Sequence, residues 1–229
     1  MNLIKSTGTF SFFVIISRVL GYFRDLLIAI YLGSGPVADA FFVAFRIPNT
    51  FRRLFAEGSF NAAFVPSYSS ELNSGETKAK KFANDAFNFL MFGLLVLVII
   101  IEILMPGFIY LIAPGFTENQ DKLELTTLLT RITFPFLFFI SLASFFSAIL
   151  NSHNKFGVAA ASSIILNIIL ILIIFFEKKY NNNLVIYLSY GVSVAGFIQL
   201  IFVYFFAKKF FTPKINFKLK LTKKIKNFF

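Results

Sequence analysis

Arginine is concentrated at the front of this 229-residue chain, inside stretches that are otherwise apolar. Five of the six arginines fall within the first 53 residues, namely Arg18, Arg24, Arg46, Arg52 and Arg53. All 16 lysines lie outside the two apolar stretches found there. A guanidinium stays charged on burial, and its planar fork binds a phosphate or carboxylate through two hydrogen bonds. The residue type and its placement therefore predict a site for an anionic ligand.

The spacing of these arginines puts them beside acids on one face of each of two expected helices. Residues seven apart lie on one stripe of a helix, and two such stripes occur, Ser11 with Arg18 and Asp25, and Asp39 with Arg46 and Arg53. Pro48 lies inside the second of these expected helices, where it removes a backbone hydrogen bond and is expected to kink the helix. Broken helices of this kind line cavities in membrane transporters.

Internal ion pairing is the alternative for the same residues. It would join Arg18 to Asp25, Arg46 to Asp39 and Arg53 to Glu57. Five arginines face only these three acids, so a surplus of about two positive charges remains. Arg52 and Arg53 stand near the end of the apolar stretch and serve equally well as anchors at the membrane surface.

Composition argues against a soluble enzyme. Hydrophobic residues make up 57% of the chain and charged residues only 14%, while the formal net charge is +11. Ordinary soluble domains are about 25% charged. With no cysteine and one histidine, the chain offers little for a metal, and we expect no metal, no cofactor and no catalytic residue. Its basic charge is typical of membrane loops, and we expect no nucleic acid as a partner.

Apolar runs predict an all-α, polytopic transmembrane bundle of about six membrane helices. About 20 apolar residues cross a bilayer, and the runs lie near 9–32, 37–56, 86–105, 132–152, 157–176 and 184–207. Residues 1–207 are thus predicted to form an N-terminal transmembrane lobe. Lysines predominate on the side that carries the chain ends, which places both termini in the cytoplasm.

Residues 208–229 are predicted to form a basic amphipathic cytoplasmic segment, in which eight lysines alternate with apolar residues. Two interpretations stay open. The segment lies on the anionic inner leaflet, or it is an anchor or a connector to a further membrane segment. Elsewhere, His153 is expected in a solvated loop. Asn167 and Gln199 are lone polar residues that either bridge helices or face a cavity.

The polar residues of the front helices also carry a family resemblance. The strings are Ser17-Arg18, Gly21, Arg24-Asp25, Ala38-Asp39-Ala40-Phe41, Phe45-Arg46-Ile47-Pro48-Asn49, Arg52-Arg53, Ala56-Glu57-Gly58 and Ala63-Phe64-Val65-Pro66. Together they resemble the N-terminal part of the MurJ/MviN lipid II flippases, which belong to the multidrug/oligosaccharidyl-lipid/polysaccharide exporter superfamily. The match is specific because it fixes several charges and a proline inside apolar helices.

The resemblance implies a bacterial inner-membrane carrier for lipid II, the undecaprenyl-pyrophosphate-linked muropeptide used in peptidoglycan biosynthesis. Such carriers work by alternating access around a cationic cavity. On this resemblance Arg18, Arg24 and Arg52 are expected to bind the pyrophosphate. The residues expected to act in gating or charge pairing are Asp25, Asp39, Arg53 and Glu57.

The resemblance covers one lobe of a two-lobed, fourteen-helix fold. We therefore expect an incomplete chain whose second lobe is supplied in cis or in trans. Two further functions are compatible with the same residues. The first is export of another polyprenyl-linked sugar or amphiphile, and the second is a scaffold in cell-wall synthesis that transports nothing.

Overall fold

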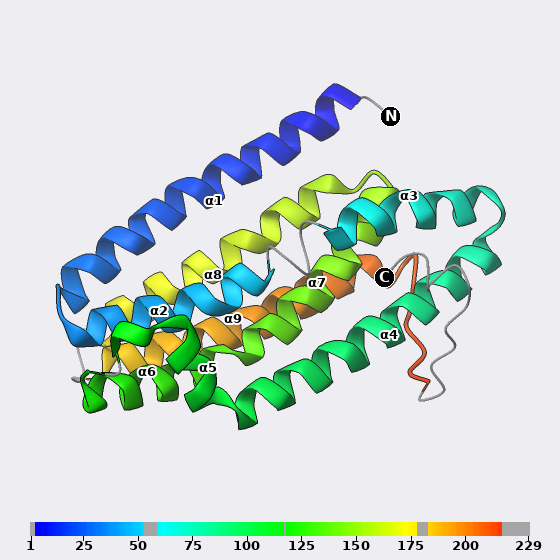
Figure 1. Cartoon of the computed structure of the whole chain (residues 1–229). Helices are drawn as coiled ribbons and strands as arrows, with labels where there is room; N and C mark the ends of the chain where they lie inside the picture. Colours follow the sequence, from blue (N-terminus) through cyan, green and yellow to red (C-terminus); the bar gives the residue numbers. More distant parts are fainter. Residues whose placement is uncertain (1–2, 53–58, 117, 178–182, 217–229) are drawn as a thin grey trace.

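The computed structural model describes residues 3–52, 59–116, 118–177 and 183–216, and over these ranges the chain is helical with short connections (Figure 1). The helices are α1 (Leu3–Leu32), α2 (Pro36–Arg52), α3 (Ser59–Asn73), α4 (Glu76–Ile103), α5 (Met105–Ile112), the 3-10 turn η2 (Pro114–Phe116), α6 (Gln120–Thr133), α7 (Pro135–Ser152), α8 (Phe156–Glu177) and α9 (Leu184–Ala207). This architecture confirms the all-α membrane-helix bundle expected from the apolar runs.

Four helical segments in the described ranges are long and apolar enough to cross a membrane. They are Glu76–Ile103, Gln120–Ser152, Phe156–Glu177 and Leu184–Ala207. Four such helices are typical of a multi-pass membrane protein. Helices α1 and α2 are not among the four: α1 contains several charges, and α2 has only 17 residues. Spanning by these two helices stays a prediction.

The helices form neighbouring pairs around α7 and α9 (Figure 1). Helix α1 lies chiefly along α8, α2 lies along α6, and α3 and α4 pack against each other and against α7. Gly33 and Gly35 have positive φ angles of 66° and 158° in the turn between α1 and α2, and Pro36 begins α2. Glycine and then a helix-starting proline are the residues such a reversal requires.

Phenylalanine fills much of the bundle interior. Phe64 of α3 stacks on Tyr68 and lies 5.0 Å, between ring centroids, from Phe145 of α7. The backbone of α9 approaches α7 closely at Gly196, where an added Cβ would come within 2.7 Å of the Phe136 ring. Because lipid is as apolar as these side chains, close packing rather than escape from water holds such helices together.

Two prolines interrupt the helical ladder, and hydroxyl groups on neighbouring helices compensate. Pro48 cannot donate to the carbonyl of Ala44, and the Thr133 hydroxyl on α6 donates to that oxygen at 2.8 Å. Helix α6 ends at Thr133, and Pro135 begins α7 after the single residue Phe134. The Ser193 hydroxyl of α9 donates to the carbonyl of Ile132 at this break. Helix α2 thus runs through Pro48 as one element, while the kink itself stays a prediction.

His153 lies at the end of the bundle where α3, α7 and the chain after α9 meet. Its ring stacks on Phe210 at 4.1 Å, and its Nε2 lies 3.4 Å from the Tyr68 hydroxyl. The sequence placed this residue in a solvated loop, whereas the structure half-buries it. Burial lowers the pKa of His153, and the nearby Glu76 carboxylate opposes that shift. Burial, assisted by Glu76, raises the pKa of Tyr68, so its hydroxyl stays protonated.

We expect the bundle to lose stability in mild acid because of His153. Its folded-state pKa lies below the unfolded value of about 6.5. Protonation of His153 therefore favours the unfolded state. The contribution of neutral His153 to stability is fully present above about pH 6.5 and decreases as the pH falls below that value. Thermal unfolding in detergent at about pH 7.5 and about pH 5.5 measures the change. His153→Gln should reduce the difference, and a melting temperature that rises in acid would contradict this assignment.

Candidate functional site

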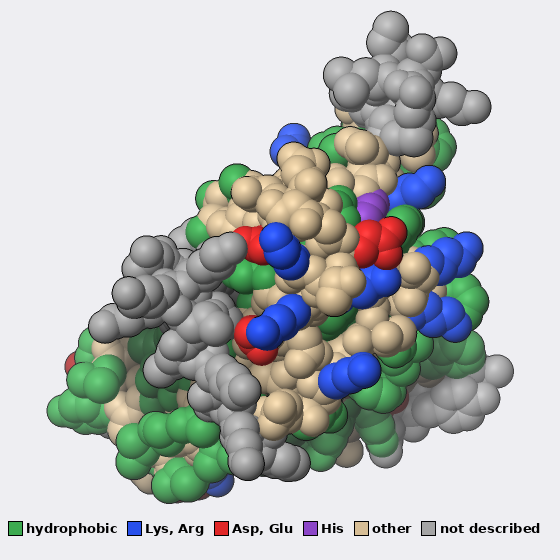
Figure 2. All heavy atoms as spheres, turned by 90° about the vertical axis from the view of Figure 1, so that its right-hand side faces the viewer, with side chains coloured by type: hydrophobic (Ala, Val, Ile, Leu, Met, Phe, Trp, Pro, Cys, Tyr) green, Lys and Arg blue, Asp and Glu red, His purple; other side chains and the backbone are tan. Residues whose placement is uncertain are grey.

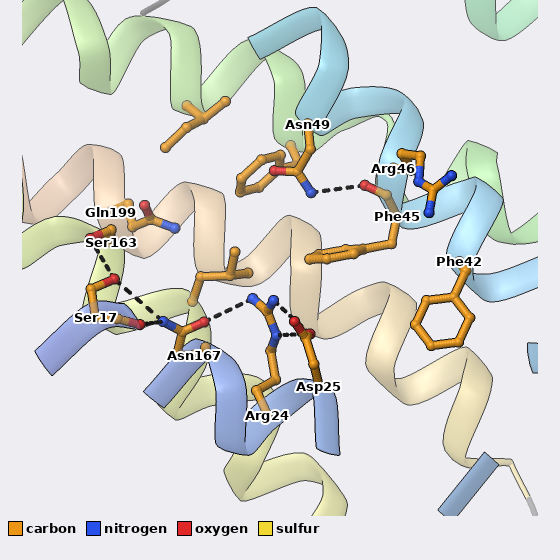
Figure 3. A pocket seen from close by; sticks show the side chains of 14 residues that line it. Ser17, Arg24, Asp25, Phe42, Phe45, Arg46, Asn49, Ser163, Asn167 and Gln199 are labelled. Carbon is orange, nitrogen blue, oxygen red and sulfur yellow. Dashed lines mark hydrogen bonds and ion pairs between the residues drawn. The ribbon is translucent and has the colours of Figure 1, made fainter. Parts of the chain in front are cut away.

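A cavity of about 570 Å³ opens between α1, α2, α7, α8 and α9 in the middle of the bundle (Figure 3). One side is apolar, with Phe42, Phe45, Phe136, Ile140 and Leu166. Its polar lining consists of Ser17, Arg24, Asp25, Arg46, Asn49, Ser163, Asn167 and Gln199. An apolar wall with a few convergent polar groups is typical of a ligand site.

Arg24 makes three side-chain hydrogen bonds in this cavity. Its Nε and Nη2 atoms donate to Oδ1 of Asp25 at 2.9 and 2.7 Å, and Nη1 donates to Oδ1 of Asn167 at 2.8 Å. The guanidinium carbon lies 5.1 Å from the centre of the Phe45 ring. The Arg24 side chain is 12% exposed, whereas that of Asp25 is 59% exposed. The guanidinium is thus fixed in position while part of its donor fork stays open to a ligand.

Asn167 connects α8 to α1 at the back of the cavity. Its Oδ1 accepts from Arg24, and its Nδ2 donates to the carbonyl of Ser17 at 2.9 Å. The hydroxyl of Ser163, one turn earlier on α8, donates to the Ser17 hydroxyl at 2.9 Å. Asn167 is only 4% exposed. The sequence left open whether Asn167 bridges helices or faces a cavity, and the structure shows that it does both (Figure 3).

Gln199 of α9 adds a polar group that lacks a partner. It is 2% exposed, it lines the cavity, and its Nε2 has no hydrogen bond among the described residues. A buried amide that donates to nothing costs about 1–3 kcal/mol. A bound acceptor at this place would remove that cost.

Helix α2 supplies the opposite wall through Arg46 and Asn49. Asn49 turns its Nδ2 back onto the carbonyl of Phe45 at 2.9 Å. Arg46 is exposed to the cavity and has no ion-pair partner in the part of the chain that the structure describes. Among the described lining residues, two arginines therefore face one acid, and the cavity is cationic.

The acids pair differently from the alternative drawn from the sequence. Asp25 pairs with its neighbour Arg24, not with Arg18. Asp39, in the first turn of α2, accepts from Nζ of Lys122 on α6 at 2.6 Å, not from Arg46. The cause is the packing of α2 along α6, which brings Lys122 to the turn between α1 and α2. Spacing along one helix carries no signal for this contact, and Lys122 was not expected from the sequence.

The remaining predicted site residues fall elsewhere. Arg18 is exposed on α1 and does not line this cavity. The backbone of Arg52 ends α2, but its side chain lies outside the described residues, as do Arg53 and Glu57 entirely. The described residues contain no group of three or more acidic or histidine side chains that could hold a metal. The structure therefore brings together Arg24, Asp25 and Arg46, and adds Asn167 and Gln199.

Three comparisons with known proteins agree on the family. The family model described as "Lipid II flippase MurJ" matches residues 28–229. A "Probable lipid II flippase MurJ" from Rhizobium tropici is 42% identical over 209 residues, which is 89% of this chain and 39% of the relative. The protein of the same name from Buchnera aphidicola subsp. Schizaphis graminum is 39% identical, over 98% of this chain and 45% of its own length.

Solved structures give the same answer. "Lipid II flippase MurJ, inward closed conformation" superposes with a TM-score of 0.79 at 32% identity, over 96% of this chain and 44% of that one. A multidrug resistance MATE family transporter of the MOP superfamily superposes with a TM-score of 0.66 at 16% identity, which shows the fold alone. The chain thus spans less than half the length of these MurJ proteins, and half the length of the MATE family transporter.

Proposed function

Because the chain belongs to the MurJ lipid II flippase family, we propose that it forms the N-terminal lobe of a bacterial inner-membrane lipid II flippase and that its cavity binds the substrate's pyrophosphate. The observation that carries the proposal is the cationic cavity, in which Arg24 is held by Asp25 and Asn167 with part of its fork open. The proposed activity is transport, with no bond made or broken and no cofactor.

The cavity supports a pyrophosphate ligand by its donors. Arg24 from α1 and Arg46 from α2 stand on different walls, and the Gln199 amide lacks an acceptor. A pyrophosphate presents many acceptor oxygens and negative charge, which suits two guanidinium groups and an amide donor. The Phe42, Phe45 and Phe136 side chains beside them suit the apolar parts of a lipid-linked substrate.

The two ion pairs suggest roles for the acids. Asp25 holds Arg24 in place, and an arriving phosphate can take over its hydrogen bonds because Asp25 is largely exposed. Asp39 and Lys122 link α2 to α6 at the turn after α1, so opening that pair would release one end of the cavity. Arg18, Arg52, Arg53 and Glu57 stay proposed contributors from the sequence resemblance.

Orientation and completeness belong to the same proposal. Lysine-rich ends and loops favour both termini of this chain in the cytoplasm, by the positive-inside rule. The matched proteins are more than twice as long, so we propose that alternating access requires a second lobe, supplied in cis or in trans.

Native mass spectrometry of the purified chain with lipid II tests the proposal. We expect lipid II to be retained and to be displaced by other polyprenyl pyrophosphates only weakly, while an uncharged polyprenol is not retained. Equal retention of the uncharged polyprenol would overturn a pyrophosphate site. Full displacement by a different polyprenyl pyrophosphate would instead favour export of another polyprenyl-linked amphiphile.

A further inference from the structure

A second pocket lies at the end of the bundle where α4 begins and α9 ends. Its volume is about 490 Å³, and five lysines line it, Lys80, Lys81, Lys208, Lys209 and Lys214. Asp85 is the one acid among the described lining residues. Figure 2 views the molecule from this end and shows lysine and arginine side chains gathered there, around the histidine and a few acids. The cationic cavity in the bundle interior shares none of these residues.

Two asparagines on α4 fix the chain that closes this pocket. Oδ1 of Asn84 accepts from the backbone N–H of Lys214 at 2.6 Å. One turn later, Asn88 donates from Nδ2 to the carbonyl of Lys214 at 3.0 Å and accepts at Oδ1 from the N–H of Asn216 at 2.9 Å. Asn88 is only 4% exposed. Lys214 is thereby tied beside Lys80 and Lys81 through its backbone, without any use of its charge.

The lysine charges of the pocket are largely uncompensated. Lys80 pairs with Glu76 at 3.0 Å, but both side chains are exposed, and such a pair contributes little. Lys81, Lys209 and Lys214 have no ion-pair partner in the described ranges. Holding several ammonium groups around one concavity is unfavourable unless an anion is there, and phosphate accepts well from ammonium donors.

The immediate surroundings of the pocket are apolar. Phe205 and Phe206, on the last turn of α9, are exposed, and so is Ile215 on the tied segment. Nζ of Lys208 lies 4.1 Å from the centre of the Phe205 ring, at the boundary between these apolar side chains and the lysines. A soluble anion would contact only the lysines and not the exposed phenylalanine side chains. A phospholipid would contact both, with its acyl chains on the phenylalanine side chains and its headgroup among the lysines.

We propose that this pocket binds the phosphate group of an anionic phospholipid from the surrounding leaflet. The acyl chains lie along the end of α9, and the phosphate lies between α4 and the segment after α9. This assignment does not rest on lipid II transport, because it uses other residues and another ligand.

Native mass spectrometry with phosphatidylglycerol, and with phosphatidylcholine as the zwitterionic comparison, tests the site. Lys209→Gln with Lys214→Gln removes two charges from the pocket, and Lys78→Gln with Lys155→Gln removes two exposed charges elsewhere in the chain. We expect the first pair to weaken phosphatidylglycerol binding about tenfold or more, from about 1 kcal/mol per lysine, and the control pair less than about twofold. Equal losses from both pairs would overturn the site in favour of a diffuse surface charge.

Two further measurements separate a built site from a count of charges. Asn84→Ala with Asn88→Ala keeps every lysine but frees Lys214, so we expect phosphatidylglycerol binding to fall while the helix content in circular dichroism is kept. Unchanged binding in this variant would overturn the role of the asparagines. Addition of millimolar inorganic phosphate should leave the lipid in place, and its displacement would assign the pocket to a soluble phosphate instead.

Discussion

Replacing Arg24 with alanine is expected to weaken lipid II binding by about tenfold to a hundredfold and to abolish translocation when the chain works with a second lobe. A hydrogen bond to a charged group contributes about 1.5–3 kcal/mol, and every 1.4 kcal/mol is about tenfold in affinity. The loss falls on pyrophosphate binding because Arg24 is the guanidinium that Asp25 and Asn167 hold in the cavity. Titration of lipid II against the purified variant, followed by mass spectrometry, measures it.

Two other substitutions show whether the guanidinium itself is required. Arg24→Lys keeps a positive charge but lacks the fork that contacts Asp25 and Asn167 together, so its affinity should lie between those of the unchanged chain and the alanine variant. Arg131→Ala, at the end of α6 and outside the cavity, removes one arginine without a change in affinity of more than about twofold. Growth supported by the Arg24→Ala protein alone would sink the proposal.

Replacing Asn167 with aspartate is expected to harm lipid II binding more than replacing it with alanine. The alanine variant loses the contact to Arg24 and the bond to Ser17 but leaves the cavity charge unchanged. The aspartate variant places a second carboxylate beside the guanidinium, at the position where the Asn167 Oδ1 lies 2.8 Å from Nη1, and it neutralises the group that a pyrophosphate needs. We expect about a further tenfold loss of affinity on this account.

Asn61→Asp is the matched control for that change. Asn61 lies on α3, outside the cavity, where it donates to Ser144 at 3.2 Å. A carboxylate introduced there adds the same charge to the bundle and should leave lipid II affinity nearly unchanged. If Asn167→Asp bound lipid II as well as the unchanged chain, Asn167 would be a bridge between helices and not part of the site.

Much of the helix content followed from the sequence because long apolar runs have few other solutions in a membrane. The predicted run at 184–207 lies where α9 lies, and the run at 157–176 lies within α8. Apolar length alone does not reveal α3, a 15-residue helix of mixed polarity, or the division of 120–152 at Pro135 into α6 and α7. Those elements depend on packing against α4 and α9 and on the Ser193 contact, which are properties of the whole fold.

The residues of the candidate site that carry charge could be predicted from the sequence, whereas the contacts that helix packing creates could not. Arginine inside an apolar helix pointed to Arg24 and Asp25, because a buried guanidinium requires a partner. The same reasoning placed Arg18 on the site. The cavity face of α1 instead follows Ser17, Gly21 and Arg24, and Arg18, about 100° around the helix from Ser17, is exposed. Asn167 was recognisable as a polar residue in an uncharged helix, whereas its contact with Arg24 joins positions 143 residues apart.

The hydrogen bonds of Asn167 and Asp39 connect the helices of each cavity wall but do not connect one wall to the other. Asn167 fastens α1 to α8, and the Lys122 contact to Asp39 fastens α2 to α6, so each wall is stiffened within itself. Contacts between α1 and α2 are few. Arg24 and Arg46 thus belong to two different helix pairs, α1 with α8 and α2 with α6. We expect the distance between the two guanidinium groups to change without the loss of a hydrogen bond inside either pair. A ligand bound by both guanidinium groups would then connect the two helix pairs and fix the distance between them.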